Sequence, residues 1–235
     1  MRLRMLLVPV LAAAALVAGC TSAPAEPATN GVDKLEPAQI LQKATEALQA
    51  AKSFRVQGKG EIQGQTSELD LTYVGKQTKG TITYEGVTLE LIQTADATYV
   101  TASDDFWKKA IADQDASVQA LVLSALAGKW VKLPSAATDT IVPDGGSFLQ
   151  PEGEGELRKG DIVTVDGKRA IELLAKDGKL RIALEGEPYP IDIVSDDGGA
   201  LKFLDVDKDV TIEAPTGVVD LTEILTQIMT QAMAG

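Results

Sequence analysis

Histidine is absent from the 235 residues of the chain. Its absence excludes Ser-His-Asp and Cys-His catalytic triads, together with the usual zinc sites. Two glycine spacings suit a phosphate-binding loop, but Thr81 and Asp161 stand where the lysine of such a loop belongs. Neither a Gly-x-Ser-x-Gly nor a Ser-x-x-Lys motif occurs. We therefore expect no enzyme activity, no catalytic residue and no cofactor; a hydrolase that uses paired carboxylates is the remaining enzymatic alternative.

Metal-binding patterns are equally scarce. Asp205, Asp207 and Asp209 alternate as in the first half of a calcium-binding loop. Such a loop needs glycine and glutamate farther on, where Val210 and Thr216 stand. Alternation in a strand would also place the three aspartates together on its solvent side. We expect no metal site.

Basic residues are few, and cysteine occurs once. The 22 Lys and Arg residues face 34 Asp and Glu residues, which gives a net charge of −12. This balance excludes nucleic acid as a partner, and it also excludes electrostatic attachment to an anionic membrane. Because Cys20 is the only cysteine, no disulfide framework can form and the apolar core alone must stabilise the fold.

Long hydrophobic runs are also missing. The apolar run 5–18 follows Arg2 and Arg4 and is too short to cross roughly 30 Å of hydrocarbon comfortably, so it is typical of a secretory signal. Val17-Ala18-Gly19-Cys20 resembles the lipobox of bacterial lipoproteins, which implies cleavage before Cys20 and a diacylglycerol on its sulfur. The alternative is an ordinary signal with an incidental cysteine. We expect a signal peptide at 1–19, a flexible Ala- and Pro-rich tether at 20–34 and one domain at 35–235.

The first half of that domain is expected to be a helix followed by a meander. A helix should begin at Pro37, because apolar residues recur at helical spacing through Ala51. Five runs then alternate apolar and polar residues with short turns between them, which indicates antiparallel strands. These runs lie at 54–62, 69–73, 82–84, 87–91 and 97–99.

Two helices, a second meander and a last helix are expected after it. Asp104 should cap a short helix, and 117–127 reads as a second helix that is apolar nearly all round. The irregular stretch 135–156 is typical of a functional or mobile loop. Strands joined by Asp-Gly turns should occupy 162–203, with a last strand at 210–214 and a helix capped by Asp220.

The elements together predict an α+β fold. Its centre is a single curved antiparallel sheet of about 11 strands, a half-barrel, with helices packed on the concave side. Such a surface is too large for these helices to fill, which leaves an aliphatic groove for a ligand. The alternative is a solid core without a cavity.

Several segments resemble one lipoprotein family. They are 41–55, Tyr99-Val100, Phe106-Trp107, 128–134 and 185–190. Their order is similar to that in the actinobacterial lipoproteins of the LppX/LprA/LprF/LprG group, which share the half-barrel of LolA-type carriers. The resemblance implies a lipid-anchored domain on the outer face of the cell membrane that holds acylated molecules between sheet and helices.

We therefore expect a membrane-anchored protein that binds or carries lipid. The helical wall of the groove should contain Trp107, Leu121, Val122 and Leu126. The sheet wall should contain Val56, Leu69, Leu71, Leu89, Leu91, Ile171 and Leu173, with Gly58 and Gly60 leaving room for the ligand. The alternative is a ligand-free interaction or sensor module that binds an envelope protein through its acidic face.

Overall fold

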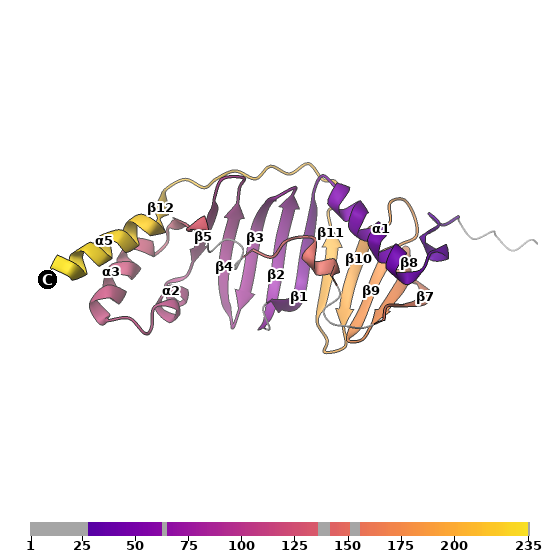
Figure 1. Cartoon of the computed structure of the whole chain (residues 1–235), viewed down its shortest axis with the longest axis horizontal. Helices are drawn as coiled ribbons and strands as arrows, with labels where there is room; N and C mark the ends of the chain where they lie inside the picture. Colours follow the sequence, from indigo (N-terminus) through magenta and orange to yellow (C-terminus); the bar gives the residue numbers. More distant parts are fainter. Residues whose placement is uncertain (1–27, 63–64, 136–141, 151–155, 235) are drawn as a thin grey trace, which may run out of the picture.

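The computed structural model describes residues 28–62, 65–135, 142–150 and 156–234. The expected signal peptide, Cys20 and the tether up to residue 27 lie outside these residues, as do parts of the stretch 135–156. The rest forms the predicted α+β fold around one large sheet (Figure 1).

The sheet has twelve strands, and two meanders meet at its centre. The first meander is formed by β1 (Phe54–Ile62), β2 (Gln65–Val74), β3 (Gln77–Tyr84), β4 (Val87–Gln93), β5 (Thr98–Ala102) and β6 (Trp130–Lys132). The second is formed by β7 (Arg158–Val165), β8 (Lys168–Ala175), β9 (Gly178–Ala183), β10 (Pro190–Ser195) and β11 (Ala200–Leu204). The strand order is β12-β6-β5-β4-β3-β2-β1-β11-β10-β9-β8-β7, so the pairing of β1 with β11 joins the two halves.

The last strand differs from the prediction. No strand forms at 210–214; instead β12 (Val218–Asp220) pairs with β6, and this is the one parallel pairing among the twelve described strands. The segment between β11 and β12 runs past the ends of the strands between them, from β11 in the middle of the sheet to β12 at its edge (Figure 1). Ile212 of this segment is buried, and Lys79 Nζ donates a hydrogen bond to the carbonyl oxygen of Thr211. The alternation at 210–214 therefore reflects a chain that lies against the domain, outside the sheet.

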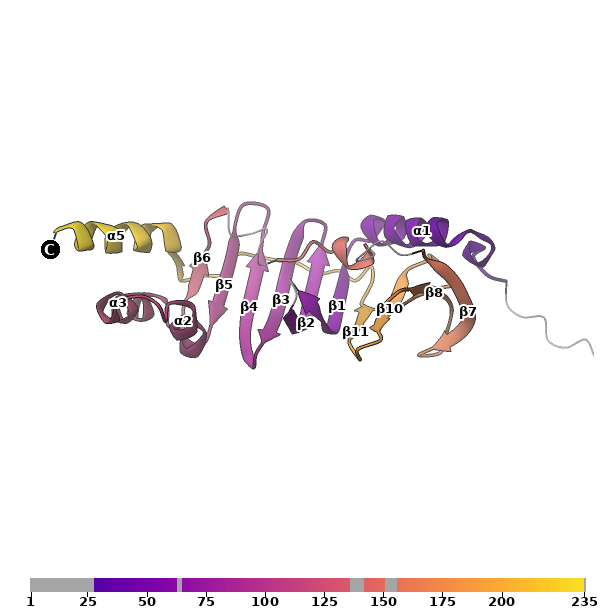
Figure 2. The same ribbon diagram turned by 60° about the horizontal axis from the view of Figure 1, so that its bottom comes forward.

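Helix α1 (Pro37–Ala50) covers the β8–β9 region. Its start is fixed as the sequence predicts: Pro37 is the first helical residue, and Gln39 Oε1 accepts a hydrogen bond from the backbone N–H of Glu36. Ile40 and Ala44 are fully buried against Ile171 and Ile182 of the sheet. Figure 2 shows this end of the sheet curling beneath α1.

Residues 30–34, which were expected to belong to the tether, are folded onto the domain. Asn30 donates its backbone N–H to the carbonyl oxygen of Leu184 at 2.8 Å and its side-chain amide to the carbonyl oxygen of Ala183 at 3.0 Å. A 3-10 helix follows (Val32–Lys34), and Val32 is buried in the cluster under α1. The folded domain therefore includes residues 30–34, because Asn30 satisfies carbonyl groups at the end of β9.

The other helices gather at the opposite end of the sheet. Figures 1 and 2 show α2 (Asp104–Ala110), α3 (Ala116–Leu126) and α5 (Leu221–Ala234) beyond β5 and β6, at the opposite end of the sheet from α1. Ser103, rather than Asp104, caps α2, since its hydroxyl accepts the N–H of Phe106. None of the helices in the described residues has both the length and the apolar character needed to cross a membrane.

Candidate functional site

Most of the residues expected to line a groove lie in one buried cluster. The cluster combines the apolar face of the sheet with residues of α2 and α3, and none of the eight predicted members below is more than 9% exposed. These members are Val56, Leu69, Leu71, Leu89, Leu91, Trp107, Val122 and Leu126. We call this the main cluster; in it, buried side chains of the sheet meet buried side chains of α2 and α3.

Leu121 does not belong to the helical wall. It is 37% exposed, whereas Val122 and Leu126, one turn apart on α3, are buried. Because α3 is apolar nearly all round, hydrophobic periodicity could not show which of its faces meets the sheet.

Ile171 and Leu173 lie elsewhere. They are buried with Ile40 and Ala44 in the separate cluster under α1, at the other end of the sheet. Alternation in the sequence shows that they face inward, but it does not show which helix covers them. A groove between the sheet and α3 would therefore lack these two residues.

Contacts with β11 explain the two glycines of β1, which were expected to leave room for a ligand. Gly58 has φ +142°, and a Cβ atom there would lie 2.0 Å from the carbonyl oxygen of Ala200. At Gly60, a Cβ atom would meet the side chain of Leu201 at 3.0 Å. Close approach of β11 therefore accounts for Gly58, and the Leu201 side chain already fills the space over Gly60.

Part of the irregular stretch covers the main cluster. Val142 and Leu149 are buried in it, Leu149 in a 3-10 helix (Ser147–Leu149). Tyr73 donates its hydroxyl to the carbonyl oxygen of Pro143 at 3.1 Å and stacks on Phe54 with 4.9 Å between ring centroids. Burial raises the pKa of the Tyr73 phenol. Sequence reasoning missed this role, and the apolar residues between the glycines and prolines of the stretch were its only signal.

Two buried polar atoms stand out in this region. Thr98 Oγ1 and Trp107 Nε1 have no hydrogen-bond partner among the described residues. Trp107 belongs to the main cluster, where its ring meets that of Phe106 edge to face at 5.1 Å between centroids. An unpaired N–H in an apolar interior costs free energy, so this indole is a candidate donor to a ligand oxygen.

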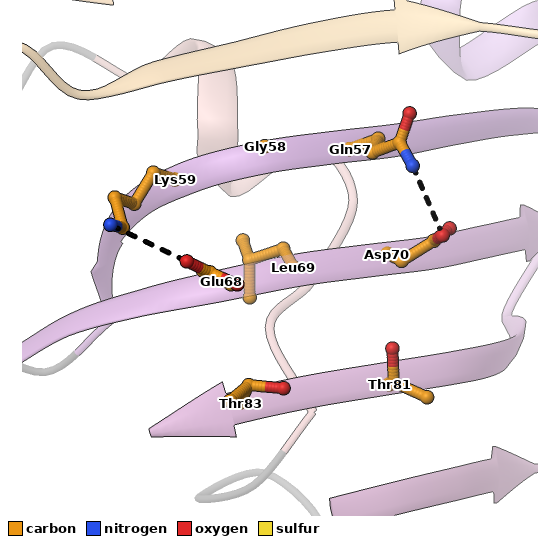
Figure 3. A pocket seen from close by; sticks show the side chains of 8 residues that line it. All are labelled: Gln57, Gly58, Lys59, Glu68, Leu69, Asp70, Thr81 and Thr83. Atoms are coloured by element: carbon orange, nitrogen blue, oxygen red, sulfur yellow. Dashed lines mark hydrogen bonds and ion pairs between the residues drawn. The ribbon is translucent and has the colours of Figure 1, made fainter. Parts of the chain in front are cut away.

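A polar depression of about 470 Å³ lies on the opposite face of the sheet (Figure 3). Its side chains come from β1, β2 and β3, and they are largely paired with one another. Lys59 Nζ lies 3.4 Å from Glu68 Oε1, and Gln57 Nε2 donates to Asp70 Oδ2 at 3.2 Å. The guanidinium of Arg55 hydrogen-bonds both oxygens of Asp70 and lowers the pKa of that carboxyl group. Gly58, Leu69, Thr81 and Thr83 also line the depression.

The turn after β11, which contains Asp205 and Asp207, is held to Ser53 by hydrogen bonds. Asp205 and Asp207 both have positive φ angles, which turn the chain out of β11. Ser53 Oγ donates to the carbonyl oxygen of Lys208 at 2.6 Å, and the backbone N–H of Asp207 donates to the carbonyl oxygen of Ser53 at 2.9 Å. In the described part of the chain, no group of three or more Asp, Glu, Cys or His residues is placed to hold a metal ion.

Comparison with known proteins gives structural likeness at low identity. No family model and no curated protein sequence matches the chain. Among solved structures, LprF from Mycobacterium bovis aligns with TM-score 0.45 and 14% identity over 77% of this chain and 97% of that one. An uncharacterized conserved protein from Thermus thermophilus aligns with TM-score 0.38 and 14% identity over 78% and 98% of the two chains. The MucA/MucB complex of Pseudomonas aeruginosa aligns with TM-score 0.33 and 14% identity over 80% of this chain and 60% of that one.

Proposed function

We propose that the chain is a lipoprotein on the outer face of the cell membrane, anchored by diacylglycerol on Cys20, that binds acyl chains between its sheet and helices α2 and α3. The anchor is supported by the basic start, the short apolar run and Val17-Ala18-Gly19-Cys20. Two or more acyl chains on one protein give stable attachment, which a single chain does not.

The observation that carries the binding proposal is the main cluster itself. It joins Leu71 and Leu91 of the sheet to Val122 and Leu126 of α3 in one aliphatic interior. Apart from Phe106 and Trp107 of α2, its aromatic residues lie near β1, β2 and β11, so the part of the wall formed by β4 and α3 is aliphatic. Flexible acyl chains fit such a wall better than planar ligands do.

The interior is closed in this structure, so binding requires a movement. Trp107, Val122 and Leu126 are the buried side chains by which α2 and α3 hold to the sheet. An acyl chain would take over their contacts with the sheet as the helices move outward. Trp107 Nε1 would then donate to an ester or amide carbonyl near the head of the acyl chain.

Native mass spectrometry of the full-length chain, extracted from its own membranes in mild detergent, tests this function. We expect the mass of residues 20–235 with a covalent diacylglycerol and, in addition, one dissociable lipid. A chain with the covalent lipid but without a dissociable lipid would support the anchor and contradict lipid binding. A chain that lacks the covalent lipid would contradict the anchor.

An interaction module is the second candidate, because the main cluster is filled by the protein's own side chains. In that case the polar face that carries Glu68 and Glu90 would contact an envelope protein, since both side chains are exposed. Crosslinking in intact cells should then recover one dominant partner. Glu68→Lys with Glu90→Lys should abolish this crosslink while leaving lipid content unchanged.

A further inference from the structure

Helices α3 and α5 form a pair with almost no charge. Residues Ala116–Leu126 include no Asp, Glu, Lys or Arg, and Leu221–Ala234 include only Glu223. In the whole chain, 24% of residues are charged. Polarity in the two helices comes instead from Ser, Thr and Gln side chains. The pair therefore differs chemically from the rest of this acidic protein.

The same pair also exposes large apolar side chains. Of the three large hydrophobic residues that are exposed in the described structure, Leu121 lies on α3 and Leu225 on α5, at 37% and 45% exposure. The two helices contact each other and extend beyond the β6–β12 end of the sheet (Figures 1 and 2). Two of the three exposed large hydrophobic residues therefore fall on this one helix pair.

We propose that this helix pair dips into the lipid–water interface of the membrane that holds the anchor. An acidic protein is repelled by anionic headgroups wherever it presents carboxylates, and within the two helices Glu223 is the one residue that would add to this repulsion. Hydroxyl and amide side chains suit the headgroup layer, and leucines suit the acyl boundary beneath it. The helices are too short to cross the bilayer, so they lie in its surface.

The proposal rests on the anchor at Cys20. The length of the segment between Cys20 and the folded domain limits how the domain can be oriented on the membrane. Asn30 is held at the end of β9, and the ten residues from Cys20 to Asn30 span at most about 35 Å. At about 4.8 Å between neighbouring strands, the nine spacings from β9 to β12 extend over roughly 43 Å, and the helix pair lies beyond β12. The helix pair reaches the bilayer only when the long axis of the sheet lies along the membrane, so we infer that the domain lies flat.

Depth-dependent quenching tests this contact. Because Cys20 is the only native cysteine and would carry lipid, Leu121→Cys or Leu225→Cys adds a single free thiol for an environment-sensitive fluorophore. The acylated full-length chain is reconstituted in phosphatidylcholine vesicles, with or without phosphatidylglycerol, that contain spin-labelled lipid. The matched control is Glu90→Cys, on the polar face of β4. Flotation of the vesicles reports the anchor separately.

We expect quenching at positions 121 and 225 and none at position 90, in both kinds of vesicle. With the fluorophore at 121, Leu225→Ser should shift the ratio of inserted to detached helices roughly tenfold toward detachment. Ile162→Ser, which removes the third exposed hydrophobic residue from β7 at the other end of the sheet, should leave that ratio unchanged. Protein that floats without quenching at 121 and 225 would overturn the proposal while the anchor stands. Protein that does not float would remove both the anchor and this contact.

Discussion

The hydroxyl of Tyr189 donates a hydrogen bond to Asp207 Oδ2 at 2.8 Å, while Asp207 Oδ1 accepts the backbone N–H of Lys52, also at 2.8 Å. This pair ties the turn before β10 and the chain after β11 to the end of α1. The Lys52 N–H and the Tyr189 hydroxyl lower the pKa of Asp207, and burial together with Asp207 raises the pKa of Tyr189 to about 12. Asp207, one of the three aspartates that suggested calcium, is therefore part of a hydrogen-bonded closure.

The raised pKa of Tyr189 predicts a loss of stability in alkali. The ordinary pKa of tyrosine is 10.0, so the neutral phenol contributes its stabilisation fully below pH 10 and loses it as the pH rises toward about 12. Tyr189→Phe should therefore reduce the slope of the unfolding free energy against pH in this range. Denaturant titrations at several pH values measure the slope, and the part that remains in the variant belongs to groups such as Tyr73. Equal slopes in both proteins would contradict the prediction.

Gly58 and Gly60 should respond differently to alanine. Gly58→Ala forces a Cβ atom against the backbone oxygen of Ala200 at a positive φ angle, and we expect a loss of about 2 kcal/mol or more of unfolding free energy. Gly60→Ala meets only the Leu201 side chain, which can move, so the expected loss is about 1 kcal/mol. Urea unfolding of the two variants measures the difference. A larger effect at Gly60 would show that β11 does not approach β1 as described.

Shortening single leucine side chains on α3 should distinguish its buried face from its exposed face. Leu126→Ala opens a cavity in the main cluster and should cost about 3 kcal/mol, because Leu126 is 1% exposed. Leu121→Ala should change stability by less than about 0.5 kcal/mol, because its side chain lies at the surface. Thermal and urea unfolding give both values. Similar costs at the two positions would mean that α3 is rotated from the orientation described.

A substitution at Trp107 should distinguish its role in core packing from its proposed role in binding a ligand. Trp107→Phe keeps an aromatic ring in the main cluster and removes the N–H that has no partner there. We expect little change in the unfolding temperature but less retained lipid, because the proposed bond from Nε1 to a ligand carbonyl is lost. Unfolding is followed by circular dichroism, and lipid retention by native mass spectrometry. Full lipid retention in the variant would exclude this hydrogen bond.

The sequence predicted local structure better than long-range placement. Alternation and turn residues located the strands of both meanders, and Pro37 located the start of α1, because these signals act over a few residues. The pairing of β1 with β11 brings residues nearly 150 positions apart together, and no local pattern specifies it. The prediction of a strand at 210–214 was wrong for the same reason, because local alternation does not show whether a segment pairs with the sheet.

The candidate site was predicted in part for a similar reason. An inward-facing residue can be recognised by its period in a strand, and Val56, Leu71 and Leu91, which were expected to line a groove, do lie on the buried face of the sheet. The helix that covers each one depends on the whole topology, so the sequence could not show that Ile171 and Leu173 lie under α1. Leu121 was misplaced because α3 offers no polar face from which to infer its orientation.

Photocrosslinking with an acyl lipid that carries a reactive group on its tail tests the central claim most directly. The lipid is incubated with the acylated full-length chain, irradiated and mapped by peptide mass spectrometry. We expect crosslinks inside the main cluster, in the peptides that contain Leu89, Leu91, Val122 and Leu126, and a marked loss of them with Leu126→Trp, which overfills the interior. Crosslinks confined to surface residues, or none above a matched lipid without the reactive group, would contradict an acyl-binding interior.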